Sequence, residues 1–230
     1  MSQFDVNLFI NYMWIVKMMI IQKYFSEFLG TGFLFAAVVG SGIMGQNLSP
    51  NNDGVILLVN TIATVFALYF LIIAFQKYST HFNPVVSMVM FLNGALSFKE
   101  LIIYAFLQII GAILGVFLIN YLFGLDVFQF SVNQRSGTNI FISEVLASFG
   151  LVLIILLSSS KNTASSVAAY IGAAYWFTSS TSFANPAASI SRMFSNTFAG
   201  ISPENVFLFC IAQFIGGILA YILYRFIYFK

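Results

Sequence analysis

Charged residues are scarce in this chain: they make up 7% of its 230 residues, whereas 60% are hydrophobic. An ordinary soluble domain has roughly 25% charged and about 45–50% apolar residues. The apolar stretches recur along the whole length, and no small-residue cleavage site follows the first of them, so a secretory signal does not account for them. The composition therefore argues against a soluble globular domain and indicates a protein embedded in a lipid bilayer.

Cysteine and histidine are nearly absent, with Cys210 and His81 the single residue of each type. One cysteine can form no intrachain disulfide and no thiolate metal site, and we expect it to be a small buried apolar side chain. One histidine, one cysteine and a few distant carboxyl groups supply no nucleophile–base pair and no metal cluster. The net charge of +2 is too small to indicate a nucleic-acid partner. We therefore expect no enzyme, no cofactor and no nucleic-acid binding.

Hydrophobic runs near the length of a spanning helix, about 20 residues, occur six times. They cover residues 25–45, 55–76, 101–123, 140–159, 164–180 and 205–228. Two shorter apolar pieces, 83–93 and 185–194, lie between these runs and are too short to span. The pattern predicts an all-α membrane protein with six transmembrane helices.

Each short apolar piece opens with an Asn-Pro pair, at Asn83-Pro84 and Asn185-Pro186. Asparagine is a good N-cap, and proline is tolerated in the first turn of a helix. Backbone that enters and leaves a bilayer without crossing it must be buried in protein or line water. The two pieces are therefore predicted to be re-entrant half-helices that border a pore or a substrate cavity.

The chain also contains an internal repeat, with halves over about 24–123 and 140–228. The matched blocks are SEFL (26–29) with SEVL (143–146), NPVVSM (83–88) with NPAASI (185–190), and QIIGAILG (108–115) with QFIGGILA (213–220). Each half carries an odd number of spans, so the second half must be inverted relative to the first. The two half-helices are expected to enter from opposite faces and to meet near the midplane.

The segment before the first run, residues 1–23, is apolar but interrupted by Asn11 and Lys17. We expect it to be a cytoplasmic or interfacial segment, either a helix lying on the membrane or a disordered lead-in. A seventh span is the alternative, since such run lengths suit interfacial and spanning helices alike. If residues 1–23 do not span the membrane, residues 24–230 form a single channel domain.

Lysine and arginine are distributed unevenly between the two sides of this predicted bundle. With both termini inside, only Arg135 and Arg192 fall on the outer side. The other seven are Lys17, Lys23, Lys77, Lys99, Lys161, Arg225 and Lys230. Because cytoplasmic loops carry an excess of basic residues, we expect both termini to be cytoplasmic.

The predicted meeting point of the half-helices combines two helix N-termini with two asparagine side chains. A helix N-terminus carries roughly half a positive charge, so two of them facing one point repel cations and protons. Asparagine amides there would donate hydrogen bonds to a passing oxygen, a scheme that selects neutral solutes. Simple loop caps are the alternative role for the asparagines. The predicted midplane comprises Asn83, Pro84, Val85, Asn185, Pro186 and Ala187.

Five further polar residues are candidates for structural support. Glu27 and Glu144 lie inside hydrophobic spans, where an ionisable group is costly. A proton relay is possible, but their matched positions favour accepting hydrogen bonds from re-entrant backbone. Gln108 and Gln213 lie beside small residues that permit close helix packing, and we expect them to pack and to form hydrogen bonds. His81 could be a pH gate, although a donor that orders its loop is the preferred role.

At these residues the sequence resembles the major intrinsic protein family, the aquaporins and aquaglyceroporins, from about Tyr24 to Tyr228. The matching motifs are SEFLGT at 26–31, HFNPVV at 81–86, Gln108 with its glycines, and ANPA at 184–187. The resemblance implies a passive channel for small neutral solutes in a bacterial inner membrane. It also implies a homotetramer in which each subunit has its own pore.

Two departures from the family pattern are informative. The first signature has Val85 where alanine is usual, and Ala188 stands where an arginine normally follows the second signature, with Arg192 one helical turn later. Counting from the asparagines without gaps, the constriction would comprise Ala63, Ala173, Ser182 and Ala188. A wide, uncharged filter of small residues should admit glycerol-like and urea-like solutes as well as water.

The sequence leaves two further hypotheses of function open, one narrower and one from another class. The segment 38–44, VVGSGIM, resembles that of bacterial members which lack the constriction arginine and are associated with passage of arsenite and related neutral metalloid acids. An ion-coupled secondary transporter is the alternative from another class, because inverted repeats and broken helices also suit transporters. Such a transporter would need an ion-binding or titrating group at the midplane, and the sequence offers none beyond the two glutamates.

Overall fold

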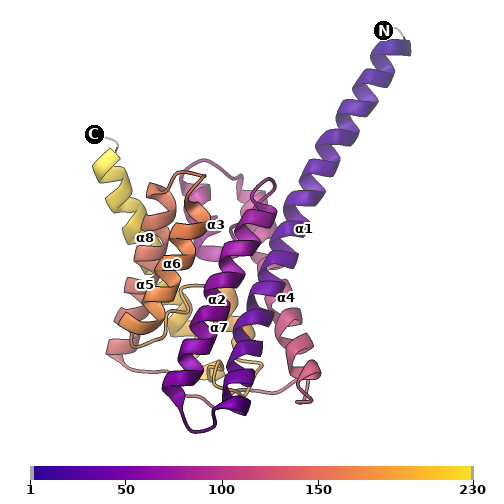
Figure 1. The fold of residues 1–230 in the computed structure, drawn as a ribbon. Helices are drawn as coiled ribbons and strands as arrows, with labels where there is room; N and C mark the ends of the chain where they lie inside the picture. The colour runs from indigo at the N-terminus through magenta and orange to yellow at the C-terminus, as the bar shows by residue number, and fades with distance from the viewer. Residues whose placement is uncertain (1–2, 229–230) are drawn as a thin grey trace.

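The computed structural model describes residues 3–228, and the side chains of Trp14 and of residues 17–228. Every regular element in this range is a helix: α1 (Gln3–Leu48), α2 (Asp53–Phe75), α3 (Pro84–Leu92), α4 (Phe98–Leu122), α5 (Thr138–Leu157), α6 (Thr163–Phe177), α7 (Pro186–Arg192) and α8 (Pro203–Tyr228). The helices form a bundle with both termini at one end (Figure 1). We call this the termini end and the opposite one the far end. The predicted all-α fold is confirmed.

The long helices coincide with the predicted spans. By length and composition, α1, α2, α4, α5 and α8 are able to cross a membrane. The fifth predicted run is α6, whose 15 residues extend about 22 Å, less than the roughly 30 Å of a hydrocarbon core. The irregular stretch 178–184 that follows it is mostly buried, as backbone at membrane depth must be.

Helix α1 begins well before the first predicted span. It runs without a break over 46 residues, roughly 70 Å, and projects beyond the other helices at the termini end (Figure 1). Asn11 and Lys17 interrupt the apolar pattern, but no glycine or proline occurs before Gly30 to stop the helix. Residues 3–23 therefore continue the first spanning helix, and the backbone has no boundary at residue 24.

The two halves of the chain have the same element order, α1–α4 and α5–α8. Helix α1 packs most extensively on α4, and α5 packs in the same way on α8. Each half-helix also contacts the other half, α3 with α5 and α8, and α7 with α1 and α4. Helix α1 enters from the termini end and α5 from the far end (Figure 1), so the predicted inverted repeat is confirmed.

The close packing within each half depends on equivalent glycines. A Cβ atom on Gly111 of α4 would lie 2.3 Å from the carbonyl oxygen of Phe28 in α1. A Cβ atom on Gly216 of α8 would lie 2.3 Å from the carbonyl oxygen of Val145 in α5. In both places the obstacle is backbone, which cannot move without separating the helices. Small residues at these positions are therefore required, as is common where membrane helices approach closely.

Gly111→Ala is accordingly expected to lower the thermal unfolding temperature of the protein in detergent. Forcing a methyl group into such a contact typically costs about 1–3 kcal/mol. Gly54→Ala is the matched control, because a Cβ atom there would meet only the Asn52 side chain, at an ordinary 3.5 Å. Equal unfolding temperatures for the two variants, measured by scanning fluorimetry, would contradict the packing argument.

Candidate functional site

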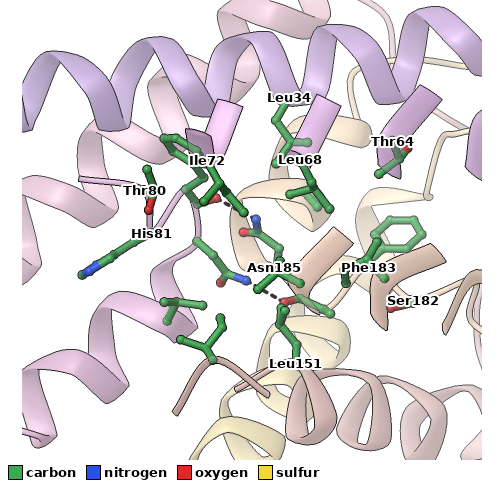
Figure 2. A pocket seen from close by; sticks show the side chains of 18 of the residues that line it. Leu34, Thr64, Leu68, Ile72, Thr80, His81, Leu151, Ser182, Phe183 and Asn185 are labelled. Atoms are coloured by element: carbon green, nitrogen blue, oxygen red, sulfur yellow. Dashed lines mark hydrogen bonds between the residues drawn. The ribbon is translucent and has the colours of Figure 1, made fainter. Parts of the chain in front are cut away.

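A central cavity of about 350 Å³ lies between the two halves of the chain and contains both Asn-Pro segments in its lining. Figure 2 shows Thr80 and His81 on one side of Asn185, and Thr64, Phe183 and Ser182 on the other. Leucine and isoleucine side chains from α1, α2 and α5, among them Leu34, Leu68, Ile72 and Leu151, form an apolar wall. The cavity is thus a mostly apolar space with polar groups at its middle and its two ends.

The two asparagines at the middle of the cavity hold the half-helices against each other. Asn83 Oδ1 accepts a hydrogen bond from Val85 N, and Asn185 Oδ1 accepts one from Ala187 N, both at 2.9 Å. Asn83 Nδ2 donates to the carbonyl oxygen of Ala184, and Asn185 Nδ2 donates to that of Phe82, both at 2.8 Å. Each asparagine therefore caps its own helix and bonds to the loop of the other half.

The carbonyl groups that accept these bonds belong to residues in an unusual backbone conformation. Phe82 has φ of 48° and Ala184 has φ of 49°, in the left-handed region, although neither is glycine. Such a conformation costs of order 1–3 kcal/mol and persists only where the surroundings impose it. Here it turns each carbonyl toward the asparagine of the opposite half.

Glu27 supports the loop that leads to the first asparagine. One of its carboxyl oxygens accepts hydrogen bonds from Ser79 Oγ at 2.5 Å and from His81 N at 2.8 Å. The other accepts from Phe82 N and Gln108 Nε2, both at 2.7 Å. The hydrogen bonds expected between this carboxyl group and the re-entrant backbone are therefore present.

Glu144 has the equivalent contacts in the second half. One carboxyl oxygen accepts a hydrogen bond from Phe183 N at 2.9 Å. The other accepts from Ala184 N at 2.9 Å and from Gln213 Nε2 at 2.7 Å. Both glutamates are fully buried, so their carboxyl groups fix the residues just before each asparagine from inside the protein.

His81 lies in the lining at the termini end, and its backbone is held by Glu27. Its ring Nδ1 is 3.1 Å from Ser87 Oγ, and the ring packs edge-on against Tyr104 with centroids 5.3 Å apart. These contacts tie the loop to α3 and α4, as the preferred interpretation of this residue requires.

The predicted constriction is found only in part at the far end of the cavity. Ser182 and Ala188 line the cavity, but Ala63 and Ala173 do not, and Ala173 is exposed on the outer surface. Their near neighbours in α2 and α6 line it instead. These are Thr64 and Tyr175, whose hydroxyl oxygens lie 3.1 Å apart.

The expectation of an uncharged far end does not hold either, because Arg192 lines the cavity. Its guanidinium carbon lies 3.4 Å from the centroid of the Phe183 ring, and its Nε donates a hydrogen bond to the carbonyl oxygen of Ala199. The side chain is only 3% exposed. A tyrosine and an arginine therefore line this end of the cavity together with Ser182 and Ala188.

Sequence reasoning also missed Arg135, in the loop between α4 and α5. Its guanidinium carbon lies 5.1 Å from the same Phe183 ring, and it donates hydrogen bonds to the carbonyl oxygens of Phe198 and Gly200 at 3.0 and 2.8 Å. Burial lowers the pKa of Arg135 from its usual value. The only signal in the sequence was that Arg135 and Arg192 were assigned to the same side of the membrane.

The comparison with protein families gives a match to the model described as "Major intrinsic protein" over residues 14–224. The chain belongs to the major intrinsic protein family. It is 44% identical to aquaglyceroporin AqpS of Rhizobium meliloti over 204 residues, which cover 87% of each chain. It is 24% identical to the probable aquaporin TIP2-2 of Oryza sativa over 90% of this chain and 88% of the relative.

The fold of this major intrinsic protein is also that of a solved family structure. The aquaglyceroporin from Plasmodium falciparum superposes with a TM-score of 0.67 at 18% identity, over 89% of this chain and 95% of that one. Family membership makes the chain a passive membrane channel and not an enzyme. The resemblance drawn from the Asn-Pro motifs is therefore confirmed, and the comparisons give no support to an ion-coupled transporter.

Proposed function

We propose that the channel conducts small neutral solutes of the glycerol and urea type, together with water, through the central cavity. One observation carries this proposal: each asparagine amide at the middle of the cavity has two N–H donors and uses one of them on a carbonyl of the opposite half. Among the residues that the structure describes, the second N–H has no acceptor. It is therefore available to a passing oxygen atom, within walls that are otherwise apolar.

The charge pattern of the midplane favours neutral solutes over ions. Helices α3 and α7 meet at their N-terminal ends, where unpaired N–H groups carry partial positive charge. Two such ends facing one point oppose the passage of cations, while the asparagine amides stabilise an uncharged solute.

The size of the cavity and the relatives support permeants larger than water. Its volume of about 350 Å³ is large enough for a three-carbon polyol with water beside it. The relative from Rhizobium meliloti and the solved Plasmodium structure are both described as aquaglyceroporins. Arsenite-type metalloid acids fit the same description, since they are small, neutral and carry hydroxyl groups.

We also propose that the termini end faces the cytoplasm of a cell whose plasma membrane holds the channel. Both termini lie at that end (Figure 1), and the basic residues outside Arg135 and Arg192 are expected there too. Lys230 belongs to this set but lies outside the described residues. A homotetramer with one pore in each subunit is the assembly that we expect from the family resemblance.

Reconstitution into liposomes tests the proposed function. In a hyperosmotic step of glycerol, urea or arsenite, vesicles that contain the protein should shrink and then reswell faster than empty vesicles. No ion gradient should be needed, because a passive pore is driven by the solute gradient alone. Solute flux that appeared only with an imposed sodium or proton gradient would contradict the proposal.

A further inference from the structure

Position 188 in α7, where family members usually carry an arginine, holds alanine in this chain, yet the cavity at that level contains a guanidinium group. Ala188 and Arg192 lie one helical turn apart, so they share one face of α7. Side chains of a helix are tilted toward its N-terminus. The Arg192 side chain therefore extends back over the turn of Ala188, where a methyl group leaves room for it, and both residues line the cavity.

The guanidinium of Arg192 is held in place by a rigid part of the protein. It packs on the Phe183 ring at 3.4 Å and donates from Nε to the carbonyl oxygen of Ala199. The Phe183 ring is in turn packed edge-on against Phe209, with centroids 5.1 Å apart, and the Phe183 backbone is bonded to Glu144. The position of this cation is thus determined by the same network that positions the second asparagine.

The outer nitrogens of Arg192 remain available for a solute. Within residues 3–228, Nη1 and Nη2 have no hydrogen-bond acceptor, although the side chain is almost entirely buried and borders the cavity. A buried charged donor without a partner is costly, so these N–H groups require water or a solute oxygen.

Ser182 provides a second unpaired group at the same end of the cavity. Its Oγ is buried and has no hydrogen-bond partner in the described part of the chain, although Ser182 lines the cavity. It directly precedes Phe183, on which Arg192 packs. A hydroxyl group can both accept and donate, so it complements the guanidinium, which only donates.

The charge at this end of the cavity is also unbalanced. Arg135 places a second guanidinium on the Phe183 ring, at 5.1 Å. In the described range the ion pair found is Lys23 with Glu100, which lies at the other end of the bundle, so neither arginine is paired with a carboxyl group. The far end therefore presents a net positive field to a solute that enters there.

We propose that Arg192 determines the specificity of this channel: it supplies, from one helical turn along α7, the guanidinium that position 188 lacks, and together with Ser182 it forms a binding subsite for the hydroxyl groups of a small polyol. The proposal rests on the proposed function, because it names the solute class and the group that selects it. Arg192 donates hydrogen bonds to polyol oxygens, and Ser182 Oγ accepts a hydrogen bond from a polyol hydroxyl group. The positive charge excludes cations before they reach the midplane.

The test removes the guanidinium group at position 192 and then introduces one at position 188. Arg192→Leu is expected to increase proton and potassium leak at least ten-fold in reconstituted vesicles and to reduce the preference for glycerol over bulkier polyols such as xylitol. Ala188→Arg in the Arg192→Leu background should restore cation exclusion and glycerol preference. Lys99→Gln is the matched control, since this exposed residue of α4 does not line the cavity, and the loss of its positive charge should leave both properties unchanged.

Further variants keep the test decisive if Arg192→Leu fails to fold. Arg192→Lys preserves the charge but not the forked donors, so it should retain cation exclusion and lose saturable glycerol transport. Ser182→Ala should weaken glycerol binding, so that glycerol flux saturates at a higher concentration, and should leave cation exclusion unchanged. Wild-type ion exclusion and glycerol preference in folded Arg192→Leu channels, or saturable glycerol transport in folded Arg192→Lys channels, would overturn the proposal. Absence of glycerol flux in the unmodified protein would instead contradict the proposed function.

Discussion

Replacing Glu144 by leucine is expected to abolish solute flux and to reduce sharply the yield of folded protein. The leucine side chain has a similar volume, but it leaves Phe183 N, Ala184 N and Gln213 Nε2 without their acceptor. Each buried donor that loses its partner costs about 1–3 kcal/mol. Because Ala184 is held in the left-handed region, the strained loop before Asn185 would lose the contacts that impose its conformation.

Glu144→Gln keeps the shape of the side chain and changes only its hydrogen bonding. The glutamine keeps one acceptor oxygen, but its amide N–H groups would face one of the donors that Glu144 now satisfies, so an intermediate loss is expected. Glu27→Leu should have an effect as large as that of Glu144→Leu, because it removes equivalent bonds in the first half. Size-exclusion profiles and glycerol flux per folded channel are the measurements. A monodisperse Glu144→Leu protein with wild-type flux would show that the carboxyl group is dispensable.

Much of the fold could be predicted because its signals are local. A run of about 20 apolar residues identifies a spanning helix wherever it occurs, and Asn83-Pro84 and Asn185-Pro186 carry the capping and first-turn chemistry of a helix start. The repeat added a long-range constraint, since matched residues in two halves must have equivalent surroundings. The contacts of Glu27 and Glu144 with re-entrant backbone follow from that equivalence.

The lining of the far end could not be predicted by counting residues. Successive residues on a helix are rotated by about 100°, so an error of one position turns a side chain away from the cavity. Ala63 in place of Thr64 is such an error, and Ala173 in place of Tyr175 is one of two positions. Which face of α2 or α6 points inward is set by packing against several other helices.

The role of Arg192 was hidden for a different reason. The sequence places its Cα atom one turn beyond the expected position, so counting along the motif assigns it no place in the constriction. A long side chain that points back along the helix can still bring its charge to that level. The position of the Arg192 guanidinium depends on Phe183 and Ala199. These residues are several positions away in the sequence and contact Arg192 only in the folded chain.

Replacing Asn185 by alanine is expected to reduce glycerol flux at least ten-fold and to destabilise the second half-helix. The variant loses the cap bond to Ala187 N, for which about 0.5–2 kcal/mol is typical. It also loses the bond to the Phe82 carbonyl, which holds the two halves together at the middle of the cavity. The free N–H group that the solute would use disappears with the same side chain.

A matched set of asparagine variants distinguishes this pore function from simple helix capping. Asn162→Ala is the control, because Asn162 is the N-cap residue of α6 but its side chain makes no cap hydrogen bond, and flux should stay at the wild-type level. Asn83→Ala should match Asn185→Ala, since the two cross-bonds are reciprocal. Asn185→Asp retains the cap acceptor but opposes an oxygen to the Phe82 carbonyl and adds a negative charge. If Asn185→Asp conducts glycerol as well as the unmodified channel and remains closed to potassium, the donor at the midplane has no part in selecting the solute.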